Sequence, residues 1–297
     1  MANSLAGVNL SRIAQLSLDA LVTEGIPLSA FVTDFSGEVK SSGDVITTRF
    51  PTVTGTVDFS STKAAGDATL TSRPVTLNQY RGVKKQFSDL EMSFSDVELS
   101  ELFVVPAISA LVDFAINYLL SQATVANGFT AYVEKTAAQL DADAVADLAQ
   151  AMTTAKIPKA GRSLILKPTY HATLAKDAKL GNVSAVGVGG VTTENVLPRI
   201  HGLTTHEYNG TIPSNSEFFE GIALNKSALL MAARAVAIPD SDMWYGKKIN
   251  IVEPRTKLPI QVSAHYDGVK YNYEWSLLFG GAVGLAANAV RIVSDVA

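Results

Sequence analysis

LFVVPAISALVDFAINYLL, the stretch from Leu102 to Leu120, contains nineteen residues and a single charge, that of Asp113. Ser109 and Asn117 are its other polar side chains. Because Ser109, Asp113 and Asn117 are spaced four residues apart, they form one narrow polar stripe on a helix that is otherwise apolar. The stretch therefore predicts a long helix that is buried except along this stripe.

The ends of this helix are marked by nearby residues. Ser95 and Glu98 have the spacing of a capping box that opens a helix. Pro106 either belongs to the first turn of the main helix or kinks a longer one. Gly128 marks the predicted end.

The residues ahead of the helix predict a polar β-ribbon. The segments 44–50, 52–59, 69–77 and 80–94 are rich in Val, Thr and Phe and partly alternate between apolar and polar residues. Thirteen of the 56 residues from 37 to 92 are charged. Because such a ribbon is marginal alone, we expect it to lie on another surface, as in a subunit completed by its neighbours. A short amphipathic helix comes before it, with Asn9 as N-cap and with Gly25 and Pro27 at its end.

Composition narrows the class of protein. The chain has 297 residues, 47% of them hydrophobic and only 18% charged, with a net charge of −4 and no cysteine. The charged share lies below the usual quarter or so, which fits either a surface in contact with copies of the chain or a well-packed independent protein. Disulfides, thiolate nucleophiles and cysteine-ligated zinc are excluded. Dense electrostatic binding of nucleic acid is not expected from this charge.

The apolar run is nearly long enough to span a bilayer, but its composition favours a core helix. Pro106, Asp113 and Asn117 all lie within it, and no cluster of Lys or Arg flanks it. The first residues lack the basic region and the apolar run of a secretory signal. We therefore expect no membrane association.

The remainder of the chain mixes helices and strands, which favours an α+β fold. Asp141 is expected to cap a helix that closes at Lys156 and Pro158. A short buried strand at 163–167 and a helix from Pro168 through Lys176 follow. Residues 181–191 read as a loop. Short strands are predicted at 201–208, 221–225, 249–252, 258–265 and 271–279, with a helix near 227–233.

Candidates for catalysis or metal binding are weak. His201, His206 and Glu207 are possible ligands, but on a strand the two histidines face opposite ways. Asp240 and Asp242 have a spacing that suits a cation, but a Pro-Asp-Ser-Asp sequence forms a simple turn more commonly than a cation site. No nucleophile elbow and no phosphate-binding loop occurs. We expect no catalytic residue, no metal and no cofactor, and a structural role.

Five motifs in one order then point to a family. They are KIPKAGRSLILKPTYHATL at 156–174, RIHGL at 199–203, GIALNKSAL at 221–229, LLFGGAVGL at 277–285 and AVRIV at 289–293. In this order they resemble the major capsid proteins of tailed bacteriophages, a family whose fold is shared with encapsulins. The resemblance covers about residues 95–293 by motif, and the earlier part by arrangement.

The resemblance implies an α+β capsid fold with five segments. These are an N-terminal arm (1–35), an extended β-ribbon loop (36–90), a peripheral domain with a spine helix (91–179, the helix near 99–123), an axial domain (180–266) and C-terminal strands returning to the body (267–297). It places Lys40 and Lys63 in the extended loop, where some members carry a cross-linking lysine. No partner asparagine or catalytic acid can be matched, so this chemistry is not carried over.

The implied function is a major capsid protein that assembles as hexamers and pentamers into an icosahedral shell. The shell would enclose double-stranded DNA, contacted without sequence specificity, within a virion assembled in the host cytoplasm. A separate scaffolding protein and a portal are the other expected partners. The alternatives are an encapsulin-type compartment and an α+β enzyme with an unrecognised site. The predicted subunit interface comprises Arg49, Phe50, Val57, Phe59, Lys63, Leu70, Arg73, Asp113 and Asn117.

Overall fold

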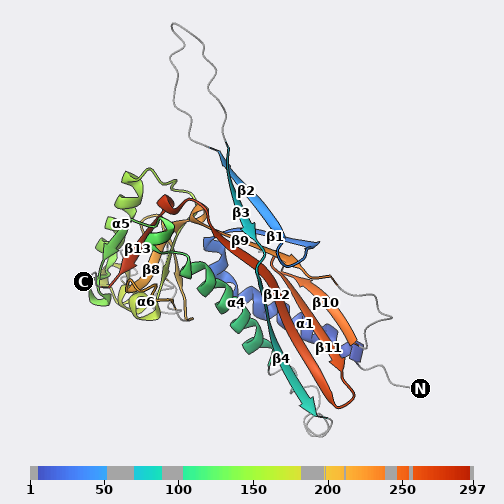
Figure 1. Cartoon of the computed structure of the whole chain (residues 1–297). Helices are drawn as coiled ribbons and strands as arrows, with labels where there is room; N and C mark the ends of the chain where they lie inside the picture. Colours follow the sequence, from blue (N-terminus) through green and yellow to red (C-terminus); the bar gives the residue numbers. More distant parts are fainter. Residues whose placement is uncertain are drawn as a thin grey trace, which may run out of the picture.

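The computed structural model describes residues 6–51, 70–88, 103–181, 197, 199–210, 212–237, 246–253 and 257–294. Its strands form two large sheets and a ribbon (Figure 1). The six-stranded sheet consists of β1 (Val32–Val39), β4 (Gln79–Ser88), β9 (Leu229–Ala235), β10 (Gly246–Val252), β11 (Pro259–Tyr266) and β12 (Lys270–Val283). Its strand order is β1-β9-β12-β11-β10, and β4 pairs with β12 as well. The five-stranded sheet has the order β5-β13-β8-β6-β7, from β5 (Tyr132–Glu134), β6 (Arg162–Leu166), β7 (Thr204–Glu207), β8 (Phe219–Asn225) and β13 (Ala289–Val293). The ribbon pairs β2 (Val45–Pro51) with β3 (Leu70–Thr76).

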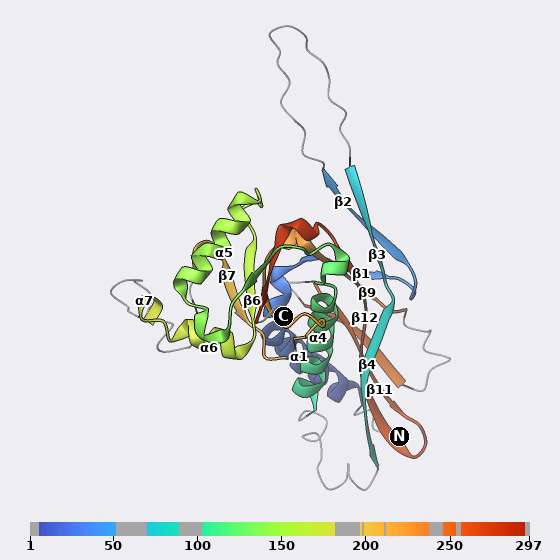
Figure 2. The same ribbon diagram turned by 60° about the vertical axis from the view of Figure 1, so that its left-hand side comes forward.

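Helices cover both sheets. The α-helices are α1 (Ala6–Glu24), α4 (Val104–Ser121), α5 (Ala142–Thr154), α6 (Pro168–Ala175) and α7 (Ala178–Gly181). Short 3-10 turns are η1 (Ile26–Ala30), η2 (Val125–Asn127), η3 (Ala137–Gln139), η4 (Lys226–Ala228) and η6 (Ala286–Asn288). Helices α1 and α4 contact each other and pack on the six-stranded sheet, and Figure 2 shows α5 and α6 beside the five-stranded one.

Helix α4 is the helix predicted from the apolar run. It buries nine of its side chains, among them Ile108, Leu111 and Ile116, in a cluster shared with both sheets. Pro106 lies in its first turn and Phe103 is the N-cap, so the predicted capping box at 95 and 98 does not open this helix; those two residues lie outside the described ones. Gly128 ends the 3-10 turn η2 instead, where its φ of 89° suits glycine.

Of the described helices, α4 alone is long and apolar enough to cross a membrane by length and composition. Half of that stretch is buried inside the fold. A core helix of a water-soluble protein meets the same criterion, and the packing of α4 on β12 and α1 is that of a core helix.

The region around α5 follows the sequence prediction closely. The Asp141 side chain accepts a hydrogen bond from the Ala144 amide at 2.8 Å and caps α5. Val145, Leu148 and Met152 are buried, as their spacing predicts. Strand β6 is buried throughout, and Pro168 begins α6.

The prediction of a helix near 227–233 is wrong. A single 3-10 turn, η4, leads directly into strand β9. All seven residues of β9 are buried, because Leu229 and Met231 face the core beneath the helices while Leu230 and Ala232 face the ribbon base. A strand buried on both faces is a continuous apolar run, which periodicity cannot distinguish from a buried helix.

Two further sequence predictions need correction. Helix α1 begins at Ala6, so Asn9 lies inside it rather than at its N-cap. The strand predicted at 201–208 shortens to β7, and His201 lies in a tight turn before it.

The sheets divide the chain differently from the five predicted segments. Residues 132–225 and 289–293 supply the five-stranded sheet, and residues 229–283 supply most of the six-stranded one. A boundary at 179/180 separates β6 from its neighbours β7 and β8, and one at 266/267 separates β11 from β12. The assignment of segments to positions in an assembly stays a prediction.

Two glycines of β12 allow the ribbon base and helix α4 to approach this strand closely, one on each face. A Cβ on Gly280 would lie 2.0 Å from the Thr76 carbonyl oxygen at the base of the ribbon. A Cβ on Gly281 would lie 2.7 Å from Leu119 of α4. The ribbon base and α4 therefore cross opposite faces of β12 at adjacent residues.

We predict that Gly280→Ala lowers the free energy of unfolding by about 1–3 kcal/mol, because its methyl group meets backbone that must move. The midpoint of urea unfolding, followed by circular dichroism, measures this loss. An unchanged midpoint would show that the ribbon base is not held against β12.

Candidate assembly surfaces

The β2–β3 ribbon leads away from the rest of the fold (Figure 1). It is anchored at its base, where Val75 and Leu77 are buried against Leu230, Ala232 and Leu278. Ile46 packs beside this cluster. Beyond the base, the described residues 71–74 are all exposed. The ribbon is therefore part of the subunit core at one end only.

The pairing of the strands sorts the ribbon side chains onto two faces. Phe50 pairs with Thr71 and Thr48 with Arg73, so Phe50 and Arg73 share the face of the buried Val75. Arg49 pairs with Ser72 and Leu70 with Pro51, so Arg49 and Leu70 lie on the opposite face, together with Val45.

The predicted interface residues of the ribbon thus differ in their surroundings. Phe50 is half-buried and packs against the chain's own cluster at the ribbon base. Arg49, Leu70 and Arg73 are exposed, and Val45 and Leu70 present 55% and 58% of their surface to solvent on one face. Val57, Phe59 and Lys63 lie outside the described residues. The role of these positions in subunit contacts stays a prediction.

The polar stripe of α4 faces a turn of the same chain. Asp113 and Asn117 are half-buried and line a depression of about 380 Å³ together with Tyr208 and Gly210. The Tyr208 hydroxyl donates a hydrogen bond to the Asp113 carbonyl oxygen at 3.0 Å. Burial, and then the Asp113 charge, raises the pKa of Tyr208. The stripe is therefore partly covered within the subunit, and its role in subunit contacts stays a prediction.

The β11–β12 hairpin tip is an exposed apolar feature that sequence reasoning missed. Val269 exposes 69% of its surface, and the Tyr266 and Tyr271 rings lie beside it, 4.8 Å apart between centroids. Asp267 orders the turn by accepting hydrogen bonds from the amides of Lys270 and Val269 and from the Asn272 side chain, and these lower its pKa to about 2. Asp267-Gly268 between apolar strands is the hairpin signal that marks such a tip.

The candidate metal ligands do not converge. Among the described residues, no group of three His, Asp or Glu side chains is arranged to hold a metal ion. His206 is buried in β7, whereas His201 is exposed in the preceding turn with a φ of 46°. The strand geometry predicted for this pair is therefore wrong at His201. Asp240 and Asp242 lie outside the described residues.

The chain resembles known proteins in its fold but not in its sequence. No family model matches the sequence, and no curated protein matches it. The capsid of cyanophage P-SCSP1u is similar in structure, with a TM-score of 0.58 and 13% identity over 90% of this chain and 87% of that one. The chain has the fold of a capsid subunit. The mature capsid of bacteriophage PhiM1 (TM-score 0.55, 10% identity, 89% and 85% covered) and the virus-like particle from Pyrococcus furiosus (0.51, 12%, 95% and 98%) share this capsid fold.

The similarity confirms the α+β capsid fold expected from the sequence motifs. At these identities the capsid fold is shared without close sequence relationship. In this chain the motif at 156–174 contains the buried strand β6 and most of α6, and the motif at 277–285 contains the glycine pair at the crossing on β12.

The buried histidines predict a pH dependence of the capsid-fold subunit. Burial and then the charge of Lys226 lower the pKa of His206, and burial lowers that of His171, partly offset by Glu207. Each folded-state pKa lies below the ordinary value of 6.5, so the unfolded chain binds more protons as the pH falls. Stability is fully present above that value and is lost as the pH falls below it.

We therefore expect the thermal midpoint to decrease between pH 7.5 and 5.5, and His206→Gln to reduce this decrease. Scanning calorimetry of both proteins at each pH measures it. His201→Asn, at an exposed position that asparagine tolerates, is the control and should retain the full decrease. Equal pH dependence in wild type and His206→Gln would contradict the assignment.

Proposed function

We propose that this chain is a major capsid protein, which self-assembles as hexamers and pentamers into an icosahedral shell around double-stranded DNA. The single observation that carries the proposal is the ribbon, because it is anchored at its base and beyond it one face, with Arg49, Leu70 and Ser72, is exposed. An isolated two-stranded ribbon is marginal in water. A neighbouring subunit supplies the surface that the chain lacks.

The exposed apolar side chains support the same function. Val45 and Leu70 lie on one face of the ribbon, and Val269 lies at the hairpin tip of β11 and β12, at the other end of the molecule (Figure 1). Contacts at distant ends allow one subunit to join several neighbours. The capsid neighbours also support a structural rather than a catalytic role, and a location in the virion shell.

The remaining partners belong to the same proposal. The shell contacts its DNA without sequence specificity, in keeping with a net charge of −4. A scaffolding protein and a portal are separate chains, and assembly takes place in the host cytoplasm. The predicted interface on the ribbon and at Asp113 and Asn117 mediates contacts between subunits.

We predict that Val45→Ser combined with Leu70→Ser prevents the formation of closed shells. Apolar burial drives subunit association, and this change removes it from one ribbon face. Stability of the subunit should change by about 0.5 kcal/mol or less, because both side chains are exposed in the subunit. Negative-stain electron microscopy and sedimentation velocity measure assembly.

The matched control is Val45→Ile combined with Leu70→Met, which retains the apolar surface and should form normal shells. A second variant replaces residues 52–69 with Asn-Gly, since Pro51 and Leu70 are paired and a two-residue turn can join them. It should stay folded and fail to close shells. Normal shells from both disruptive variants would contradict the role of the ribbon.

An encapsulin-type compartment is the second candidate, favoured by the similarity to the Pyrococcus furiosus particle, which covers 95% of this chain. The two functions differ in cargo. We expect purified shells to contain nuclease-protected DNA, measured by absorbance and gel electrophoresis after nuclease treatment. Shells that hold a protein cargo and no DNA would establish the compartment instead. A small, discrete oligomer in sedimentation would favour an enzyme.

A further inference from the structure

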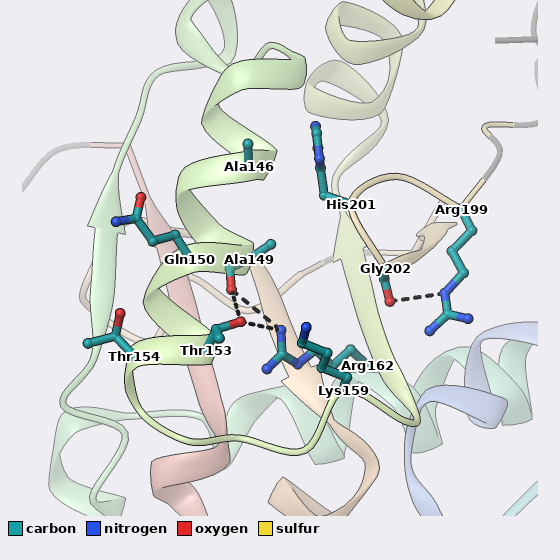
Figure 3. A pocket seen from close by; sticks show the side chains of 10 residues that line it. All are labelled: Ala146, Ala149, Gln150, Thr153, Thr154, Lys159, Arg162, Arg199, His201 and Gly202. Atoms are coloured by element: carbon teal, nitrogen blue, oxygen red, sulfur yellow. Dashed lines mark hydrogen bonds between the residues drawn. The ribbon is translucent and has the colours of Figure 1, made fainter.

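A polar pocket lies between helix α5 and the turn that precedes β7, away from the ribbon. Its volume is about 670 Å³, within the range of small-molecule sites. Figure 3 shows its described lining residues, which include Lys159, Arg162, Arg199 and His201. No Asp or Glu occurs among these described residues.

Strand pairing assembles the pocket from two distant segments. Strands β6 and β7 run parallel, with Ser163 paired to Thr204, so their N-terminal ends lie side by side. Arg162 begins β6, and the turn from Ile200 to Leu203 comes directly before β7. This turn is closed by two backbone hydrogen bonds between Ile200 and Leu203, at 3.0 and 2.8 Å. The pocket is thus held by the sheet.

Arg162 places a buried positive charge in the pocket wall. It is 3% exposed, and its guanidinium donates to the carbonyl oxygens of Pro158, Ile157 and Ala149 and to the Thr153 hydroxyl. These acceptors hold it at the C-terminal end of α5, but each of them is neutral. No carboxylate within the described residues forms an ion pair with it. Within the described residues its positive charge is therefore offset by neutral acceptors alone.

Arg199 and Lys159 add two charges at the exposed rim. The Nε of Arg199 donates to the Gly202 carbonyl oxygen at 3.0 Å, which orients the guanidinium (Figure 3); its terminal nitrogens have no hydrogen-bond partner among the described residues. The turn that provides this oxygen has positive φ at both central residues, 46° at His201 and 85° at Gly202. A non-glycine residue in this conformation is held there by its surroundings. Within the described part of the chain, neither Arg199 nor Lys159 is paired with an acid.

We propose that this pocket binds a phosphate oxyanion, from free phosphate or from a nucleic-acid backbone. Three cations on one concave surface repel one another when the pocket is empty, and an oxyanion removes that repulsion. Arginine binds phosphate through two parallel N–H donors, and lysine binds it as a point charge. The Thr154 hydroxyl and the Gln150 amide supply further donors, whereas the Thr153 hydroxyl already donates to the Ala149 carbonyl oxygen. This binding is independent of shell assembly.

The test is calorimetric titration of the purified full-length chain with inorganic phosphate at pH 7.5 and constant ionic strength, and separately with a short single-stranded oligodeoxynucleotide. We expect saturable binding of at least one probe. Lys159→Gln combined with Arg199→Gln should weaken it by about tenfold or more, because charge-assisted hydrogen bonds are lost. Arg162 is not substituted, since it also holds the end of α5.

The control is Lys176→Gln combined with Lys247→Gln, which removes the same charge from exposed positions outside the pocket. It should bind as the wild type does, and circular dichroism should show both variants folded. Binding of phosphate identifies the free ion as a ligand, and binding of the oligonucleotide alone identifies nucleic acid. Absence of binding to both probes, or equal loss in both variants, would overturn the proposal. Shell formation by the pocket variant is a separate readout, so a failure here leaves the proposed capsid function standing.

Discussion

Burial of both faces of β12 is the constraint on which the rest of the structure depends. This strand pairs with β4, β9 and β11, so it joins segments from the two halves of the chain. Its side chains at Trp275 and Phe279 face the helices, whereas Leu278 faces the base of the ribbon. Gly280 and Gly281 then remove the side chain on each face where the ribbon and α4 come closest. The direction in which the ribbon leaves the body follows from this crossing.

The same strand ties the N-terminal helix to the core. The Trp275 indole N–H donates to the Ser17 hydroxyl at 3.0 Å, and Ser17 in turn donates to the Ile13 carbonyl oxygen. Both side chains are buried, so leaving either group unpaired would cost about 1–3 kcal/mol. Helix α1 is therefore positioned by a polar contact inside an apolar layer, which amphipathic spacing along α1 cannot reveal.

The sequence predicted local structure best where capping or turn residues mark an element. Asp141 and Pro168 located α5 and α6, and alternation located the ribbon strands. It failed for β9, because burial on both faces removes the alternation. It also failed at His201, where a tight turn replaces the strand. Parallel pairing of β6 with β7 is decided by the whole sheet, so the five predicted segments do not follow the sheets.

For the candidate surfaces too, local sequence identified the segments, whereas long-range strand pairing decided which residues lie together. Composition identified the ribbon as a segment that cannot bury itself, but only strand pairing assigns Phe50 and Leu70 to opposite faces. The pocket cations Arg162 and Arg199 were part of the family motifs, yet they are 37 residues apart, and nothing local indicates that they share a cavity. A search for cations at the starts of predicted strands would have found both.

Different residues of the ribbon contribute to folding of the subunit and to its proposed association with neighbours. Val75 and Leu77 at the base are buried within the subunit and contribute to its stability, whereas Val45 and Leu70 gain burial only from another molecule. Burying apolar surface contributes roughly 25 cal/mol per Å², so a short exposed face adds a few kcal/mol to each contact. Contacts of this size are weak singly and become strong when repeated around a closed shell. The ribbon face of Val45 and Leu70 therefore contributes nothing to the subunit core, whereas the opposite face, with Phe50 and Val75, packs partly on the subunit itself.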